Sequence, residues 1–122
     1  MRFSCFSLLD FLSSPLRRGT KNGGPLIAFS GGLGVELDLA RAPAEGDVSD
    51  QARLFAESAG RFLVEVAADN CRAFAEIVAG CPVGQLGSVT DGGRIVIASG
   101  GATLIDVTIE QAKAAWQGTF AW

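Results

Sequence analysis

The sequence predicts a layered α+β fold, in which a mixed sheet of about five strands carries helices packed on it. In the first half, segments with the period-two alternation of strands take turns with helical segments. Two tight glycine turns in the second half then join consecutive strands, which favours antiparallel pairing there. With 122 residues, 48% of them hydrophobic and 19% charged, the chain suits one globular domain with a single core.

The domain is expected to begin near Pro25. Residues 1–24 contain a basic cluster and end at Asn22-Gly23-Gly24-Pro25, which breaks regular structure. We therefore predict a poorly ordered leader over 1–24 and the folded domain over 25–122. The apolar run near the start is interrupted by Asp10 and lacks a cleavage site, so a cytoplasmic location is expected.

Strand and helix segments alternate from residue 35 onward. Val35–Leu39 alternates apolar and polar residues, as a half-buried strand does. Ser49 or Asp50 can cap a short helix that carries Phe55. The apolar run Arg61–Ala67 is expected to form the next strand.

A second helix is predicted between this strand and Gly80, which acts as its stop. Phe74, Ile77 and Val78 follow the i, i+3, i+4 spacing and form its expected buried stripe.

Two turns and a capping box organise the C-terminal part. Val83–Thr90 is predicted as a strand that bulges or approaches another backbone, because it contains two glycines. Asp91-Gly92-Gly93 is expected to close a hairpin, and Ser99-Gly100-Gly101 a second one. Thr108 and Gln111 form a capping box for the last helix.

The composition excludes several kinds of chemistry. The chain has no histidine, so a Ser-His or Cys-His nucleophile cannot form within it. Its three cysteines lack Cys-x-x-Cys spacing, which argues against a zinc site or a disulfide framework. The net charge of −3 gives no reason to expect nucleic acid, and no apolar run is long enough to cross a membrane. No catalytic residue and no metal site is predicted.

Two local clusters leave alternatives open. Glu57, Ser58 and Arg61 lie at a helix-to-strand junction, where they could bind a sugar or phosphate or form a surface ion pair with a capping hydroxyl. Gly31 and Gly32 precede a strand rather than a helix, which favours a tight turn over a phosphate-binding loop.

One acidic pair also has two possible roles. Glu36 and Asp38 share one face of their strand, either as magnesium ligands or as solvated side chains.

Three segments carry a family resemblance, and they are Phe29-Ser30-Gly31-Gly32-Leu33-Gly34, Phe55-Ala56-Glu57-Ser58-Ala59-Gly60-Arg61-Phe62-Leu63-Val64, and Trp116-Gln117-Gly118-Thr119-Phe120. In this order they resemble the C-terminal domain of the synthetase subunit of phosphoribosylformylglycinamidine synthase, from the aminoimidazole ribonucleotide synthetase-like superfamily. The resemblance runs from about Leu26 to Trp122.

The resemblance implies a function. The family is an ATP- and magnesium-using ligase of de novo purine biosynthesis, which turns an amide into an amidine with ammonia derived from glutamine. Glu57 and Ser58 match a Glu-Ser-Gln turn that holds substrate in the sister copy of this domain, but Ala59 replaces the glutamine. Glu57, Ser58, Arg61, Gly31 and Gly32 are therefore implied as ligand or interface residues.

The chain also departs from the family. The His-Asp-x-Ser-Asp-Gly-Gly signature expected before Gly31 is absent, and so is the ATP-binding half. We therefore expect a domain or fragment that is inactive alone, binds no cofactor itself, and has the missing half or other synthetase subunits as partners. The alternative is a stand-alone binding or oligomerisation module without catalysis, such as a homodimer.

Overall fold

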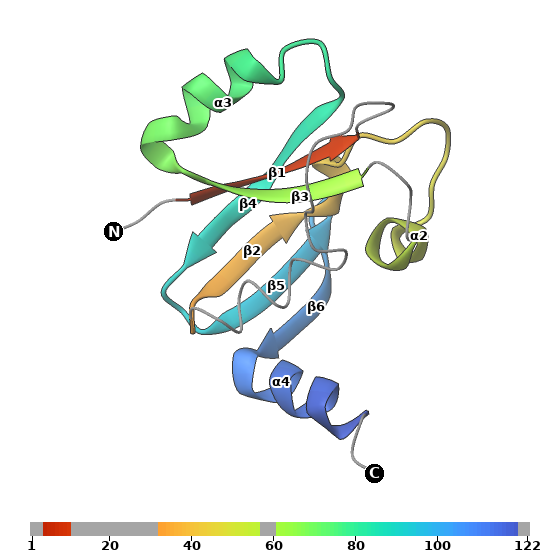
Figure 1. Ribbon diagram of the computed structural model, residues 1–122. Coiled ribbons are helices and arrows are strands. Elements are labelled where there is room, and N and C mark those ends of the chain that lie inside the picture. Colours follow the sequence, from red (N-terminus) through yellow and green to blue (C-terminus); the bar gives the residue numbers. More distant parts are fainter. Residues whose placement is uncertain (1–3, 11–31, 57–60, 120–122) are drawn as a thin grey trace.

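A computed structural model describes residues 4–10, 32–56 and 61–119 (Figure 1). The described residues form a six-stranded sheet of order β3-β1-β4-β2-β5-β6. Its strands are β1 (Ser4–Asp10), β2 (Gly34–Asp38), β3 (Arg61–Ala67), β4 (Val83–Thr90), β5 (Arg94–Ser99) and β6 (Ala102–Thr108). The helices are α2 (Asp50–Phe55), α3 (Cys71–Ile77) and α4 (Ile109–Gly118), with short 3-10 turns η1 (Leu39–Arg41) and η2 (Ala68–Asn70).

The sheet is mixed, as the sequence predicts. β2 runs parallel to β5, whereas the other four neighbouring pairs are antiparallel. The second predicted hairpin forms as expected, between β5 and β6, with a register shift between Ile97 and Ala98. The α+β class is thus confirmed.

The first predicted hairpin is wrong in its pairing. The turn at residues 91–93 does join β4 to β5, but β2 lies between them and pairs with both. Val35 of β2 has Val89 on one side and Ile95 on the other. A three-residue turn is long enough for this, because two strand spacings amount to only about 10 Å.

The expected leader is also corrected over Ser4–Asp10. This segment forms β1, which lies inside the sheet and pairs antiparallel with both β3 and β4. The physical reason is that β3 and β4 run parallel with a gap between them, and an apolar strand fills it. Residues 1–3 and 11–24, like the predicted boundary at Pro25, lie outside the described residues.

Helix α3 connects β3 to β4 and contacts β3 (Figure 1). Its sheet-facing stripe consists of the half-buried Cys71, Phe74 and Val78. Ile77 is not part of it, because its side chain is 81% exposed. At 100° per residue, Ile77 lies about 90° from the centre of the 71/74/78 stripe, so the predicted stripe is right for Phe74 and Val78 and wrong for Ile77.

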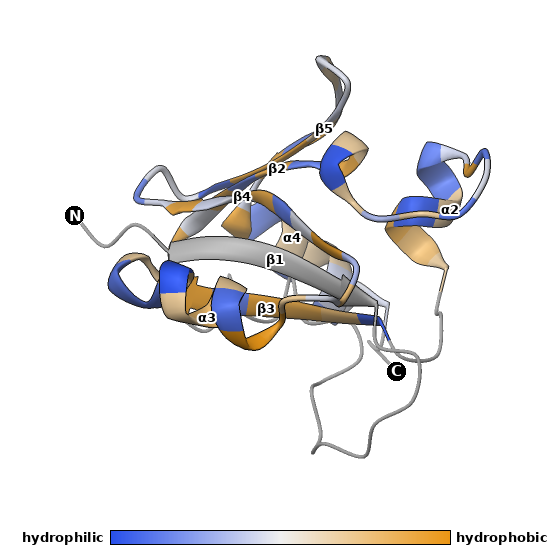
Figure 2. Ribbon diagram, turned by 90° about the horizontal axis from the view of Figure 1, so that it is seen from above, coloured by the Kyte–Doolittle hydropathy of each residue, from blue (hydrophilic) through white to orange (hydrophobic). Residues whose placement is uncertain are grey.

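The core lies against the middle of the sheet, and Figure 2 shows apolar residues along β2, β4 and β5. Its buried members are Val35, Ala42, Leu86, Val89, Ile95 and Ile109. Leu63 of β3 and Val107 of β6 pack against this cluster, so both ends of the sheet order contribute to it. Each fully buried aliphatic side chain stabilises the fold by roughly 1.5–3 kcal/mol.

The glycines of β4 allow close backbone approach, as expected from the sequence. A side chain at Gly84 would overlap the backbone of Arg41, and one at Gly87 would overlap the backbone of Glu36. The pairing of β1 with β4 also shifts register opposite this stretch, between Phe6 and Ser7.

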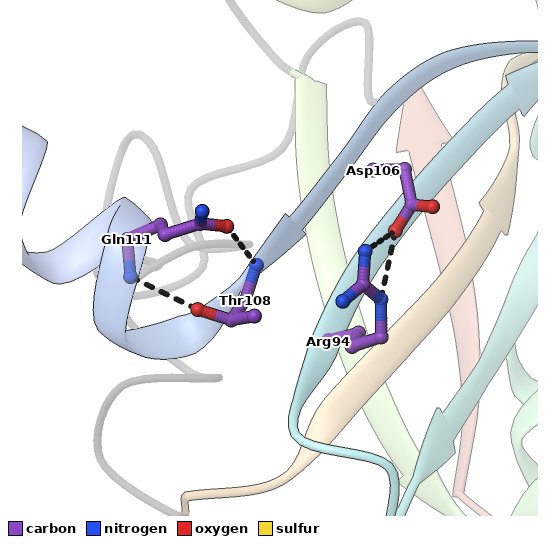
Figure 3. A network of polar contacts seen from close by, with 4 residues as sticks. All are labelled: Arg94, Asp106, Thr108 and Gln111. Atoms are coloured by element: carbon purple, nitrogen blue, oxygen red, sulfur yellow. Dashed lines mark hydrogen bonds and ion pairs between the residues drawn. The ribbon is translucent and has the colours of Figure 1, made fainter.

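The predicted capping box starts α4 (Figure 3). The Gln111 amide donates to Thr108 Oγ1 at 3.1 Å, and the Thr108 amide donates to Gln111 Oε1 at 2.9 Å. Two of the amides that a helix start leaves without intrahelical partners are thereby satisfied.

Candidate functional site

The strand registers gather several polar side chains at one end of the sheet. At this end β1, β2 and β5 finish while β3, β4 and β6 begin. Helix α2 lies beside it (Figure 1), so we refer to it as the α2 end. It holds Asp38, Arg61 and Ser99, which are the terminal residues of β2, β3 and β5.

Of the predicted site residues, Arg61 is described. It is half-buried at the first position of β3, and its Cα partner in β1 is Asp10. Glu57, Ser58 and Gly31 lie outside the described residues. A ligand role for these four residues therefore stays a prediction.

Gly32 lies at the opposite end of the sheet, two residues before β2. It is exposed and has a φ of +65°, as expected for a tight turn. Because the five residues of β2 span roughly 17 Å, the structure does not bring Gly32 together with Arg61.

Asp38 makes local structural contacts. Its Oδ1 accepts from the Ala40 amide at 3.0 Å and from the Gly100 amide at 3.2 Å. Its Oδ2 lies 3.9 Å from Arg41 Nε. Asp38 thus caps η1 and forms a hydrogen bond with the turn between β5 and β6.

The magnesium alternative gains no support from the described part of the chain. Glu36 is exposed, two residues before Asp38. Among the described residues, no group of three or more cysteine or acidic side chains is placed to hold a metal ion.

Helix α2 brings two further polar residues to this end of the sheet. Asp50 Oδ1 accepts from Ser99 Oγ at 2.6 Å. Arg53 donates to the carbonyl oxygen of Leu39 at 2.9 Å and to that of Val48 at 3.2 Å. Sequence reasoning missed these contacts, because no local pattern links residues 49 positions apart.

The described polar contacts hold neighbouring segments of the fold together. Every buried side-chain nitrogen or oxygen in the described part has a hydrogen-bond partner. The Cys71 thiol donates to the carbonyl oxygen of Ala67 at 3.4 Å, a backbone contact that provides no base. This arrangement can hold chain segments in position at the α2 end.

Comparison with known proteins defines the class. A family model described as "AIR synthase related protein, C-terminal domain" matches residues 22–99, which is more than half of the chain. The chain belongs to this family, as its resemblance to aminoimidazole ribonucleotide synthetase-like proteins suggested.

Three of the chains that it matches are PurL proteins. The phosphoribosylformylglycinamidine synthase subunit PurL of Thermoplasma acidophilum is 28% identical over 91 residues, which make up 75% of this chain and 12% of that protein. The structure of T. maritima PurL complexed with ATP aligns with a TM-score of 0.67 at 18% identity, covering 75% of this chain and 16% of that one. For T. maritima PurL complexed with ADP the TM-score is 0.61 at 20% identity, covering 68% and 15%.

These matches confirm the predicted fold, and the chain spans a small part of each relative's length. Within its described residues, no helix is long and apolar enough to cross a membrane.

Proposed function

We propose that this chain is the C-terminal domain, or a fragment containing it, of phosphoribosylformylglycinamidine synthase, the ATP-dependent ligase of de novo purine biosynthesis. The observation that carries the proposal is the agreement between family, sequence relative and fold. The family model covers residues 22–99, the named relative aligns over 91 residues, and the sheet superposes on PurL with a TM-score of 0.67. A cytoplasmic location belongs to the same proposal.

We propose that the chain performs no turnover alone. It contains no histidine, and the segment that it matches is 12% of the Thermoplasma protein. Its partner is then the ATP-binding half, or other synthetase subunits. ATP and magnesium belong to the assembled enzyme in this proposal and are not held by this chain itself.

Within the assembly, Glu57, Ser58 and Arg61 contact the ligand or the neighbouring half. The position of Arg61 at the α2 end of the sheet supports this role. A guanidinium binds phosphate or carboxylate oxygens through two parallel hydrogen bonds. Gly31 and Gly32 are proposed only as interface residues, since Gly32 lies at the other end of the sheet.

The decisive assay measures amidine formation by the purified chain from formylglycinamide ribonucleotide, ATP and ammonium. No product above the enzyme-free background is expected. ATP-dependent amidine formation by the chain alone would contradict the proposal that the domain is inactive without its partner.

A second experiment tests the proposal that this chain is a fragment of the synthetase. The genomic DNA and transcript upstream of Met1 are sequenced. An ATP-binding half with the His-Asp signature, in frame or shifted, is the expected result. Unrelated sequence behind a stop codon and a promoter would instead favour a free-standing module.

The alternative function is an oligomerisation or binding module without catalysis. Phe55 is 73% exposed on α2, Ile77 81% on α3 and Trp116 51% on α4. Exposed apolar side chains mark an interface where they form one contiguous patch, and these three lie on separate helices. Sedimentation over a hundredfold concentration range separates the two proposals, because a homodimer would support the module and a monomer would count against it.

A further inference from the structure

Helix α2 has no apolar anchor in the core. None of its residues is buried, and none belongs to the core cluster or to the side chains packed against it. Phe55, its last residue, is 73% exposed. A six-residue helix is also too short to persist by itself in water. Ala52 and Leu54 are half-buried, but among the described residues the core cluster does not account for the position of α2.

Within the described part of the chain, two side-chain hydrogen bonds join α2 to β5 and η1. Asp50, its first residue, accepts the 2.6 Å hydrogen bond from Ser99 at the end of β5. Arg53, one turn later, donates at 2.9 Å to the carbonyl oxygen of Leu39 in η1. Both hydrogen bonds involve a charged group, and such bonds are stronger than those between neutral groups.

The two residues that α2 binds, Leu39 and Ser99, are held in place by contacts that do not involve α2. The Leu39 side chain is buried, and its carbonyl oxygen also accepts from the Ala42 amide at 3.0 Å. Ser99 is paired with Ala102 of β6, and the adjacent Gly100 amide donates to Asp38. If α2 moves away, the sheet and η1 therefore keep their own hydrogen bonds.

We propose that α2 with its flanking residues Val48, Ser49 and Ala56 is a strap that opens as a unit of its own. The Ser99–Asp50 and Arg53–Leu39 hydrogen bonds hold the strap closed. When both break, α2 unfolds while all five strand pairings persist. The described chain from Ala42 to Ala56 then changes its path without any change in the sheet. This device is independent of the function proposed above, because it depends on no ligand and no partner.

Hydrogen exchange of the full chain tests the strap. The reporters are two amides with helical hydrogen bonds. The Arg53 amide donates to the carbonyl oxygen of Ser49 at 3.0 Å, and the Ala56 amide to that of Ala52 at 2.9 Å. The variants are Ser99→Ala and Arg53→Met, the second of which keeps the aliphatic stem. Each is expected to speed exchange of both reporters by about tenfold, because a hydrogen bond to a charged group is lost. Amides in the β2–β4 and β2–β5 pairs should keep their rates.

Arg72→Met is the matched control. Arg72 is also a helical arginine with a polar partner, but it forms an exposed ion pair with Glu76 of the same helix, at 3.4 Å. The control should leave the α2 reporters unchanged.

Two results would overturn the proposal. If the wild-type α2 reporters exchange as fast as unstructured peptide, the strap is not held closed. If Ser99→Ala and Arg53→Met leave the exchange rates of all amides unchanged, α2 does not open separately. The same holds if they speed exchange of the strand amides as much as that of the α2 reporters.

Discussion

At position 87, β4 has no room for a side chain. A β-carbon at this position would overlap the Glu36 carbonyl on the neighbouring strand. We expect Gly87→Ala to lower the free energy of unfolding by about 3 kcal/mol or to prevent folding, because overpacking displaces backbone. Urea denaturation measures this change.

Gly118→Ala is the control for the glycine substitution. Gly118 lies at the end of α4, and a β-carbon there meets no atom within 4 Å. The helix propensity of alanine should raise stability by up to about 1 kcal/mol. Equal losses from the two substitutions would show that β2 and β4 are not closely paired at Gly87.

The Arg94–Asp106 pair is expected to contribute little. Arg94 Nη2 and Nε both donate to Asp106 Oδ1, at 2.6 and 2.9 Å, but both side chains are 48% exposed (Figure 3). In a double-mutant cycle with Arg94→Ala and Asp106→Ala, we expect a coupling free energy below about 1 kcal/mol, decreasing with salt. A coupling of several kcal/mol that is insensitive to salt would contradict this description of the pair as solvated.

At the scale of one element, the start of α4 depends on its capping box. Thr108→Ala removes the oxygen that accepts from the Gln111 amide. The expected loss is about 1 kcal/mol in the free energy of unfolding, since the amide is left to water. Thr108→Ser keeps the acceptor and should be close to wild type. If both variants lose the same stability, the methyl group and not the cap is responsible.

Substituting one isoleucine in β5 and one in α3 tests which of the two side chains faces the core. Ile95 is 6% exposed in the core, whereas Ile77 is 81% exposed on α3. Ile95→Ala should cost about 2–5 kcal/mol, because it leaves a cavity among packed side chains. Ile77→Ala should change stability by less than about 0.5 kcal/mol. A large loss at Ile77 would mean that α3 packs through a different face.

Most elements of the domain could be predicted because their signals are local. The alternation in 35–39, the cap at Ser49 and the Thr108–Gln111 box each depend on residues within one or two turns. The pairing of strands depends on distant residues, so the insertion of β2 between β4 and β5 was missed. Ile77 was misassigned since the i, i+3, i+4 rule fits two adjacent stripes on a short helix.

At the scale of the whole molecule, β1 joins β3 to the rest of the sheet. In the described residues, β3 pairs with β1 alone. Ser7→Pro places a residue without an amide between two hydrogen-bonded neighbours, and proline is not tolerated there. We expect loss of cooperative unfolding and of strand signals from residues 61–67 in NMR spectra, whereas Ser7→Ala should retain both. Native spectra for Ser7→Pro would show that β1 is not an interior strand.

The candidate site was less predictable than the fold. The family resemblance implied Arg61 and Gly32 together as ligand or interface residues, whereas the sheet places them at opposite ends. The sequence could not indicate that Asp50 meets Ser99, since that contact exists only once β2 and β5 lie side by side. The proposed function rests on the family resemblance, whereas the residues alone indicated no reaction.

The location of β1 also has a consequence for protein synthesis. β1 is the first of the described strands to leave the ribosome, but its two partners lie at residues 61–67 and 83–90. At about 5–20 residues per second, β1 waits roughly 4 to 16 seconds before both partners have been translated. During that interval both of its edges are open to pairing with other chains. The yield of native protein should therefore depend on translation speed and on chaperones that cover nascent strands.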